Sequence, residues 1–140
     1  MSDKFFLDTN LFVYSFDGEP STKALKATQL IRKAISSGKG FVSYQVVQEF
    51  FSVALRRFER PMRPEEAEQY LATVFRPLLV IHSSQALYSD GLQVMRRYRF
   101  AWYDALIVAG AIQAQCGVLY SEDFQDGQRL GDLEIRNPFL

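Results

Sequence analysis

Short apolar runs alternate along this chain with longer segments in which apolar residues recur at helical spacing. The runs show no polar alternation, which is typical of strands that helices cover on both faces. They lie at residues 5–7, 41–43, 78–81 and 118–120, with a short fifth at 133–135. Strands that alternate with helices predict an α/β fold, a three-layer α/β/α sandwich around a central parallel sheet of four to five strands.

The segments between the strands carry the start and stop signals of helices. Ser21 is an expected N-cap, and Gly38 is the expected end of that helix. Another helix begins at Pro64 and is expected to end at Pro77, because proline in a helix interior breaks the hydrogen-bond ladder. The most apolar segment, residues 105–114, predicts a helix buried against the sheet.

Composition is that of an ordinary globular protein and excludes binding by bulk charge. The length of 140 residues predicts a single domain, residues 1–140. Lys plus Arg is 16 and Asp plus Glu is 16, so the formal net charge is zero. A protein that binds nucleic acid or anionic membrane by bulk positive charge is therefore excluded. The single Cys116 excludes an internal disulfide. With no apolar stretch long enough to span a bilayer and no export signal, we expect a cytoplasmic protein.

Four acidic residues occupy positions where a carboxylate is unusual. Asp8 directly follows the first strand and Asp123 lies shortly after the fourth, where ligands gather in such sheets. Glu49 borders the apolar stripe of its helix and has no basic residue three or four positions away. Asp104 opens the most apolar helix. Taken singly, the three aspartates are equally compatible with helix caps or loop acids, and Glu49 with a boundary residue that reaches water.

Convergence of these four acids would require a cation, because their mutual repulsion would otherwise be severe. Carboxylate oxygens suit the hard ions Mg²⁺ or Mn²⁺, whereas zinc is disfavoured because only His82 and Cys116 are available. An ion that is bound by carboxylates and keeps free coordination positions for water and phosphate is typical of enzymes that hydrolyse phosphodiester bonds. The number of ions stays open. The sequence has no glycine-rich phosphate loop, so no organic cofactor is expected.

Four short motifs contain these acids. They read Phe6-Leu7-Asp8-Thr9-Asn10, Gln48-Glu49-Phe50, Tyr103-Asp104-Ala105-Leu106-Ile107 and Leu119-Tyr120-Ser121-Glu122-Asp123-Phe124, and the chain closes on Ile135-Arg136-Asn137-Pro138-Phe139. In this order and spacing, the motifs resemble those of the PIN-domain ribonucleases, and most closely those of the VapC-type toxins of prokaryotic toxin–antitoxin pairs. The resemblance covers essentially the whole chain and implies a PIN-like fold.

The resemblance also assigns roles to the acids. Asp8, Glu49, Asp104 and Asp123 match the four acidic positions of the family. Asp8 and Asp104 would be the main Mg²⁺ ligands, and the other two acids would complete the cluster directly or through water. This implied set is both the catalytic and the metal-binding set.

Polar neighbours of the acids match the family as well. Thr9 and Asn10 stand at the small polar positions beside the first acid, where they can orient its carboxylate. Ser121 replaces the more usual threonine and keeps the hydroxyl. Glu122 and Asp126 lie close to Asp123 in sequence, so the sequence leaves open whether one of them shares its role.

The implied function is that of a Mg²⁺-dependent endoribonuclease, the toxin of a toxin–antitoxin pair, which hydrolyses RNA phosphodiester bonds with a water activated by the ion. A homodimer and a small cognate antitoxin that blocks the acidic groove are also implied. The sequence does not give the RNA target or the antitoxin. Two other classes stay open: a PIN-like binding module without catalysis, and a phosphatase or phosphoacceptor domain. The phosphatase motif has a second aspartate at the position of Asn10, so this residue counts against a phosphatase.

Basic and aromatic residues are compatible with an RNA substrate but also with ordinary helix ends and core packing. The arginines form two clusters: Arg56, Arg57, Arg60 and Arg63, and Arg96, Arg97 and Arg99. The aromatic residues beside the second cluster are Tyr98, Phe100, Trp102 and Tyr103. Such rings can stack on unpaired bases.

Overall fold

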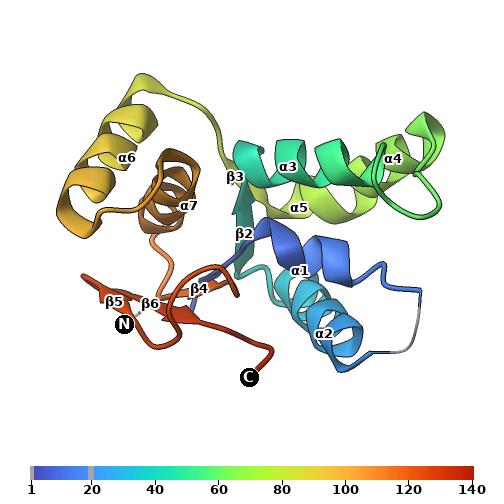
Figure 1. The fold of residues 1–140 in the computed structure, drawn as a ribbon, viewed down its shortest axis with the longest axis horizontal. Coiled ribbons are helices and arrows are strands. Elements are labelled where there is room, and N and C mark those ends of the chain that lie inside the picture. The colour runs from blue at the N-terminus through green and yellow to red at the C-terminus, as the bar shows by residue number, and fades with distance from the viewer. Residues whose placement is uncertain (1, 19–20) are drawn as a thin grey trace.

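A twisted sheet runs through the centre of the molecule (Figure 1). The structure is a computed structural model that describes residues 2–18 and 21–140. In these residues the strand order is β3-β2-β1-β4-β6-β5, and every pair is parallel except β5 with β6. The strands are β1 (Phe5–Leu7), β2 (Gly40–Ser43), β3 (Leu79–Ile81), β4 (Val118–Tyr120), β5 (Arg129–Leu130) and β6 (Leu133–Arg136).

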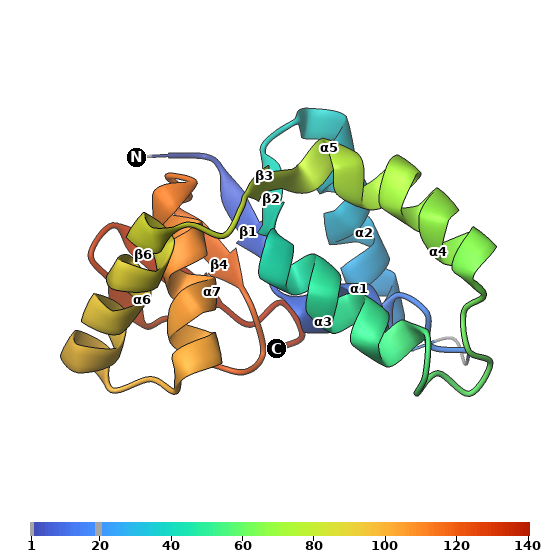
Figure 2. The same ribbon diagram turned by 90° about the horizontal axis from the view of Figure 1, so that it is seen from above.

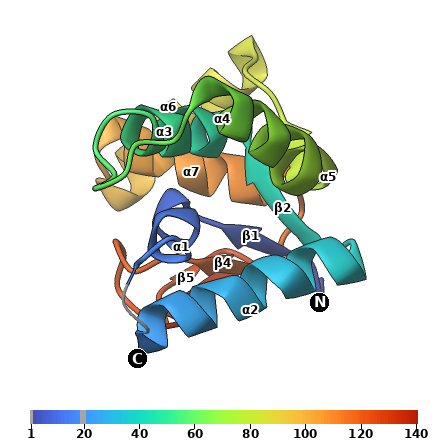
Figure 3. The same cartoon turned by 90° about the vertical axis from the view of Figure 1, so that its right-hand side faces the viewer.

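Helices lie on both sides of this sheet. They are α1 (Thr9–Tyr14), α2 (Thr22–Ser37), α3 (Tyr44–Ala54), α4 (Pro64–Tyr70), a π-helical turn η1 (Leu71–Phe75), α5 (Arg76–Leu78), α6 (Gln85–Tyr98) and α7 (Trp102–Gln113). α2 covers one face and α7 the other (Figure 3). Seen from above, α6 packs beside α7 at one end of the molecule, and α4 lies at the other (Figure 2). The predicted three-layer α/β/α architecture is confirmed.

Aromatic packing fixes the helices that leave the carboxyl edge of the sheet. The ring of Phe50 in α3 lies 5.0 Å from that of Tyr70, stacked upon it, and 6.5 Å from that of Phe12 in α1. Phe12 and Phe50 are completely buried. Aromatic pairs of this kind add to the free energy gained from burial alone. They therefore hold α1 and α3 in fixed positions against each other.

The predicted signals at both ends of α2 are confirmed. The Ser21 hydroxyl accepts a hydrogen bond from the Ala24 N–H at 3.0 Å, which caps α2. Gly38 ends α2 with φ of +70°, a conformation in which glycine has no steric penalty. Within the described residues, no helix has both the length and the apolar character that a bilayer-spanning segment needs.

The sequence missed one strand and ended one helix too early. The five predicted strands form the parallel part of the sheet, and a sixth strand in the described residues, the two-residue β5, pairs antiparallel with β6 across a turn at Gly131. A strand this short leaves no hydrophobic pattern. The helical path also continues past Pro77 to Leu78, because Pro77 lies in the first turn of α5, where its missing N–H is not needed.

We predict that Gly40→Ala destabilises the protein by about 2 kcal/mol or more, as overpacking of a tight core does. A Cβ at Gly40 would lie 2.6 Å from the Ala34 Cα in α2 and would overlap its Cβ. Urea unfolding measures the loss. Gly18→Ala is the matched control, because a Cβ there meets nothing within 4 Å. Equal stability of the two variants would contradict the close contact between β2 and α2.

Candidate functional site

The carboxyl edge of the sheet gathers the acids that the sequence singled out. Asp8 follows β1 and Asp123 follows β4, and these strands pair in parallel, so both acids lie at one edge. Glu49 is on α3, which starts where β2 ends, and Asp104 is in the first turn of α7. Four separate elements thus supply the four carboxylates.

Asp8 is the most enclosed of the four acids, with 5% of its surface exposed. It caps α1: its Oδ1 accepts a hydrogen bond from the Thr9 N–H at 2.7 Å. Its Oδ2 accepts one from the hydroxyl of the fully buried Ser121, also at 2.7 Å. The Ser121 oxygen in turn accepts the Asp123 N–H at 3.1 Å. Ser121 therefore links the first acid to the loop that carries the fourth.

Glu49 is held by two partners from different elements. Its Oε1 accepts a hydrogen bond from the Thr9 hydroxyl at 2.7 Å, and its Oε2 accepts one from the Gln45 amide at 3.3 Å. Thr9 thus contacts two acids at once, with its N–H on Asp8 and its hydroxyl on Glu49.

Gln45 is a site residue that the sequence analysis missed. It is buried, and its Nε2 also donates to the Tyr103 carbonyl at 3.0 Å, next to Asp104. One amide therefore ties α3 to the start of α7. In the sequence, Gln45 lies four residues before Glu49, so both side chains are on the same side of an apolar helix, and this spacing could have indicated their contact.

Repulsion between the acids shows in their pKa values. Burial raises the pKa of Asp8 to about 7, against the hydrogen bonds from Ser121 and Thr9, and the charges of Asp123 and Glu49 raise it further. Burial, then Asp123, then Glu49 raise the pKa of Asp104. Asp123 and Glu49 are thus close enough to Asp8 and Asp104 to disfavour the ionised forms of those two acids.

The pKa of the fourth acid, Asp123, is also raised, but not by the other three acids. Its pKa is raised by burial and then by the charge of Glu122, against a lowering by the Asn10 amide. The Asn10 amide is thus close to the Asp123 carboxylate, although the two groups make no hydrogen bond of normal geometry. None of the ion pairs among the described residues reaches Asp8, Glu49, Asp104 or Asp123. The cluster is therefore acidic without internal neutralisation.

The two acids that compete with Asp123 in sequence have other partners. Glu122 accepts a hydrogen bond from the Tyr14 hydroxyl and pairs with Lys23 at 3.0 Å. Asp126 Oδ1 accepts the Asn137 N–H at 2.8 Å. Both carboxylates thereby fasten the C-terminal part of the chain, and this geometry favours Asp123 as the fourth acid of the cluster.

The donor set fits a hard divalent ion, although the side chains are not arranged as ligands. No three His, Cys, Asp or Glu side chains among residues 2–18 and 21–140 stand close enough to hold a metal ion. Ion binding would therefore require the carboxylates to turn toward one another. The Asn10 amide is buried beside them with both polar atoms unpartnered, which leaves an oxygen and a nitrogen for a ligand. Carboxylate and amide oxygens are the donors that Mg²⁺ and Mn²⁺ prefer.

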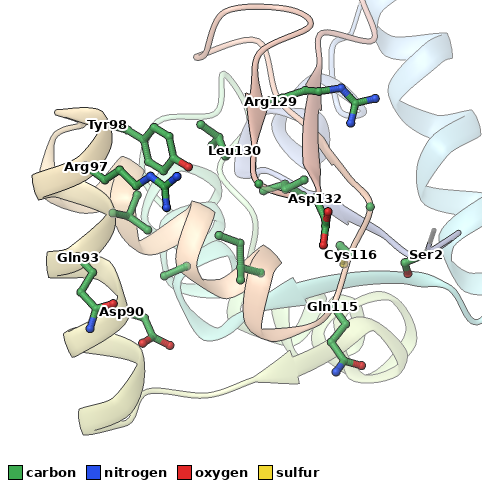
Figure 4. Close-up of a pocket in the computed structure, with 16 residues that line it drawn as sticks. Ser2, Asp90, Gln93, Arg97, Tyr98, Gln115, Cys116, Arg129, Leu130 and Asp132 are labelled. Carbon is green, nitrogen blue, oxygen red and sulfur yellow. The ribbon is translucent and has the colours of Figure 1, made fainter.

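A cavity of about 830 Å³ lies away from the acids (Figure 4). It is bounded by α6, the end of α7 and the β5–β6 turn, and its charged side chains include Arg97 and Asp132 (Figure 4). Ser2 and Gly117, which line it, precede β1 and β4, so it reaches the amino ends of the strands. Cys116 lines it too; burial raises the pKa of its thiol to about 12, which keeps it unreactive.

Comparison with known proteins identifies the family. Residues 5–126 match the model of the PIN domain. The chain belongs to the PIN-domain family. No curated protein sequence matches it significantly. The match spans all four motifs that carry Asp8, Glu49, Asp104 and Asp123.

Solved structures with this fold include a toxin–antitoxin complex and a toxin. A toxin–antitoxin complex from Klebsiella pneumoniae has a TM-score of 0.68 at 18% identity, over 96% of this chain and 98% of that one. The Sarcin-Ricin loop cleaving toxin VapC20 of Mycobacterium tuberculosis has a TM-score of 0.61 at 16% identity, over 86% and 90%. FitAcB from Neisseria gonorrhoeae has a TM-score of 0.63 at 16% identity, over 96% and 98%. At these identities the likeness concerns the fold.

We predict that Asp8→Asn stabilises the metal-free protein at neutral pH. Because the pKa of Asp8 is higher in the folded than in the unfolded protein, protonation of Asp8 stabilises the folded state. This stabilisation is complete below pH 3.8 and is lost as the pH rises to about 7. Removing this titration should raise the free energy of unfolding at pH 7.5 by about 1 to 3 kcal/mol. Urea unfolding in EDTA measures it, with the exposed Asp132→Asn as the control. A less stable Asp8→Asn protein would contradict the repulsion.

Gln45→Leu tests the amide that joins α3 to α7. The substitution keeps the volume but leaves the Tyr103 carbonyl and one Glu49 oxygen without their donor, so we expect a loss of about 1 to 2 kcal/mol. Thermal unfolding measures it. Gln48→Leu is the matched control, because Gln48 is exposed on the same helix. Equal losses in the two variants would show that the buried amide has no special role.

Proposed function

We propose that this PIN-domain protein is a Mg²⁺-dependent endoribonuclease and the toxin of a toxin–antitoxin pair. The observation that carries the proposal is the gathering of four carboxylates without a basic partner at the carboxyl edge of the sheet. Burying carboxylates without a basic partner costs free energy, and the capping of α1 by Asp8 does not call for three further acids beside it. A site that is unfavourable for folding is best explained by a bound cation.

Asp8 and Asp104 would hold the ion most directly, with Glu49 and Asp123 completing the set. Mg²⁺ or Mn²⁺ would supply a Lewis acid for the scissile phosphate and lower the pKa of water at the site. The protein's own contribution is orientation. Ser121 and the Thr9 N–H fix the Asp8 carboxylate from two sides, and the Thr9 hydroxyl fixes Glu49.

An RNA chain is the substrate that we propose. A second cavity lies where α1 and α3 end, and its lining mixes Arg57 and Arg60 with Asp17, Glu59 and Glu66, so its charge does not select for phosphate. The proposal of RNA therefore rests on the acid cluster and the PIN-domain match. A loop-cleaving toxin among the solved structures of this fold is compatible with that substrate class.

The partners that we propose follow from the same comparisons. One structure of this fold is described as a toxin–antitoxin complex, and two others contain a bound DNA fragment. For this chain we propose a small antitoxin that covers the acid cluster, a homodimer, and action in the cytoplasm, where RNA is accessible.

Sequencing of RNA ends after brief expression tests the proposed function. We expect new RNA ends with the wild-type protein and none with Asp8→Asn or Asp104→Asn, whose cleavage in vitro should fall at least about 100-fold because a principal ligand is lost. EDTA should abolish cleavage, and Mg²⁺ or Mn²⁺ should restore it. Asp132→Asn is the matched control. Equal cleavage by Asp8→Asn would contradict the mechanism.

Two other outcomes would replace the proposal. Absence of Mg²⁺ binding at millimolar concentration, together with absence of cleavage, would indicate a PIN-like binding module. A stable phosphoaspartate on Asp8 would indicate a phosphoacceptor.

A further inference from the structure

An exposed tyrosine ring stands next to the acid cluster. Tyr103 is 66% exposed, and it directly precedes Asp104 in the first turn of α7. The Cα atoms of consecutive residues are about 3.8 Å apart, so the backbone of Tyr103 lies directly beside that of Asp104. A single exposed aromatic side chain is ordinary on a protein surface, so the position of Tyr103 next to Asp104, rather than its exposure alone, directs attention to a ligand.

The backbone that carries this ring is fixed to the site. The Tyr103 carbonyl accepts a hydrogen bond from Gln45 Nε2 at 3.0 Å, and the same amide group bonds Glu49. The position of Tyr103 relative to two of the acids is therefore set before any ligand arrives. Preorganisation of this kind reduces the entropy lost on binding.

Other aromatic side chains from separate helices lie around Tyr103. Burial, and then the nearby Tyr88, raise the pKa of Tyr44 to about 12, and Tyr103 adds to this effect. Tyr88 is 40% exposed, and its ring lies 6.2 Å from that of Trp102. Residues Tyr44, Tyr88 and Tyr103, the tyrosine cluster, thus join α3, α6 and α7 beside the acids.

The other rings that the sequence offered for base stacking are used elsewhere. Tyr98, Phe100 and Trp102 are partly buried and pack against the core. The ring of Phe100 is stacked on Tyr98 at 6.0 Å and meets Phe124 edge-on at 5.2 Å. Of the four aromatic residues beside the second arginine cluster, Tyr103 alone has a largely free face.

We propose that Tyr103 stacks on an unpaired base adjacent to the scissile phosphate, so that the enzyme cuts RNA that is single-stranded at this point. The inference rests on the proposed ribonuclease function and specifies its substrate. Every base presents a π face, and stacking on an aromatic side chain needs a base that is not already paired. A protein partner is the competing occupant, but the position of Tyr103 directly before Asp104 favours the nucleic acid.

An abasic scan of the substrate tests this inference. The probe is a short RNA that spans the mapped cleavage site, with an abasic ribose in place of each nucleotide in turn. With the wild-type protein, kcat/KM should fall about tenfold at one position beside the cut. Tyr103→Leu should lose about tenfold on the intact RNA and lose no more when that base is missing. Tyr103→Phe, which keeps the ring, should stay within about twofold of the wild type.

Three results would overturn the inference while the proposed function stands. In the first, Tyr103→Leu cleaves the intact RNA as the wild type does. In the second, its loss remains the same at every abasic position. In the third, Tyr103→Leu changes the oligomeric state and regains activity at higher protein concentration, which would assign the ring to a protein interface. Failure of the wild type to cleave any RNA would overturn the proposed function and this inference together.

Discussion

Parallel pairing of β1 with β4 is the constraint on which the rest of the site depends. It brings Asp8 and Asp123 to one edge of the sheet, and α3 and α7 add Glu49 and Asp104 from neighbouring positions. The charges of Asp123 and Glu49 then raise the pKa values of Asp8 and Asp104, and none of the ion pairs in the described residues neutralises the four acids. The fold thus accepts an electrostatic penalty that a divalent cation can reverse.

The surrounding structure fixes these charges in place. Buried aromatic rings hold α1 against α3, and the hydroxyls of Ser121 and Thr9 and the amide of Gln45 hold the carboxylates of Asp8 and Glu49. The Ser121–Asp8 and Thr9–Glu49 bonds join elements that are distant in the chain, and the Gln45–Glu49 bond lies within α3. A variant that loses one of these hydrogen bonds should therefore shift a carboxylate without removing it. Such variants distinguish residues that position the acids from the acids that would bind the ion.

Much of this arrangement can be predicted from sequence because strand ends and helix starts have local signals. Asp8, Asp104 and Asp123 are noticeable for their places beside apolar runs. The role of Gln45 depends on a partner 58 residues away, which no local pattern reports. The choice among neighbouring acids was also out of reach, because Tyr14 and Lys23 engage Glu122 only in the folded chain. The two-residue β5 leaves no periodicity at all.

A crystal structure with Mn²⁺ tests the central claim most directly, because anomalous scattering locates the ion independently of the protein chain. The account predicts a peak about 2 Å from carboxylate oxygens of Asp8 and Asp104, with Glu49 and Asp123 turned toward it. The Asn10 amide should then have a partner. Absence of a peak at this edge, with the four carboxylates still apart at saturating Mn²⁺, would contradict the account.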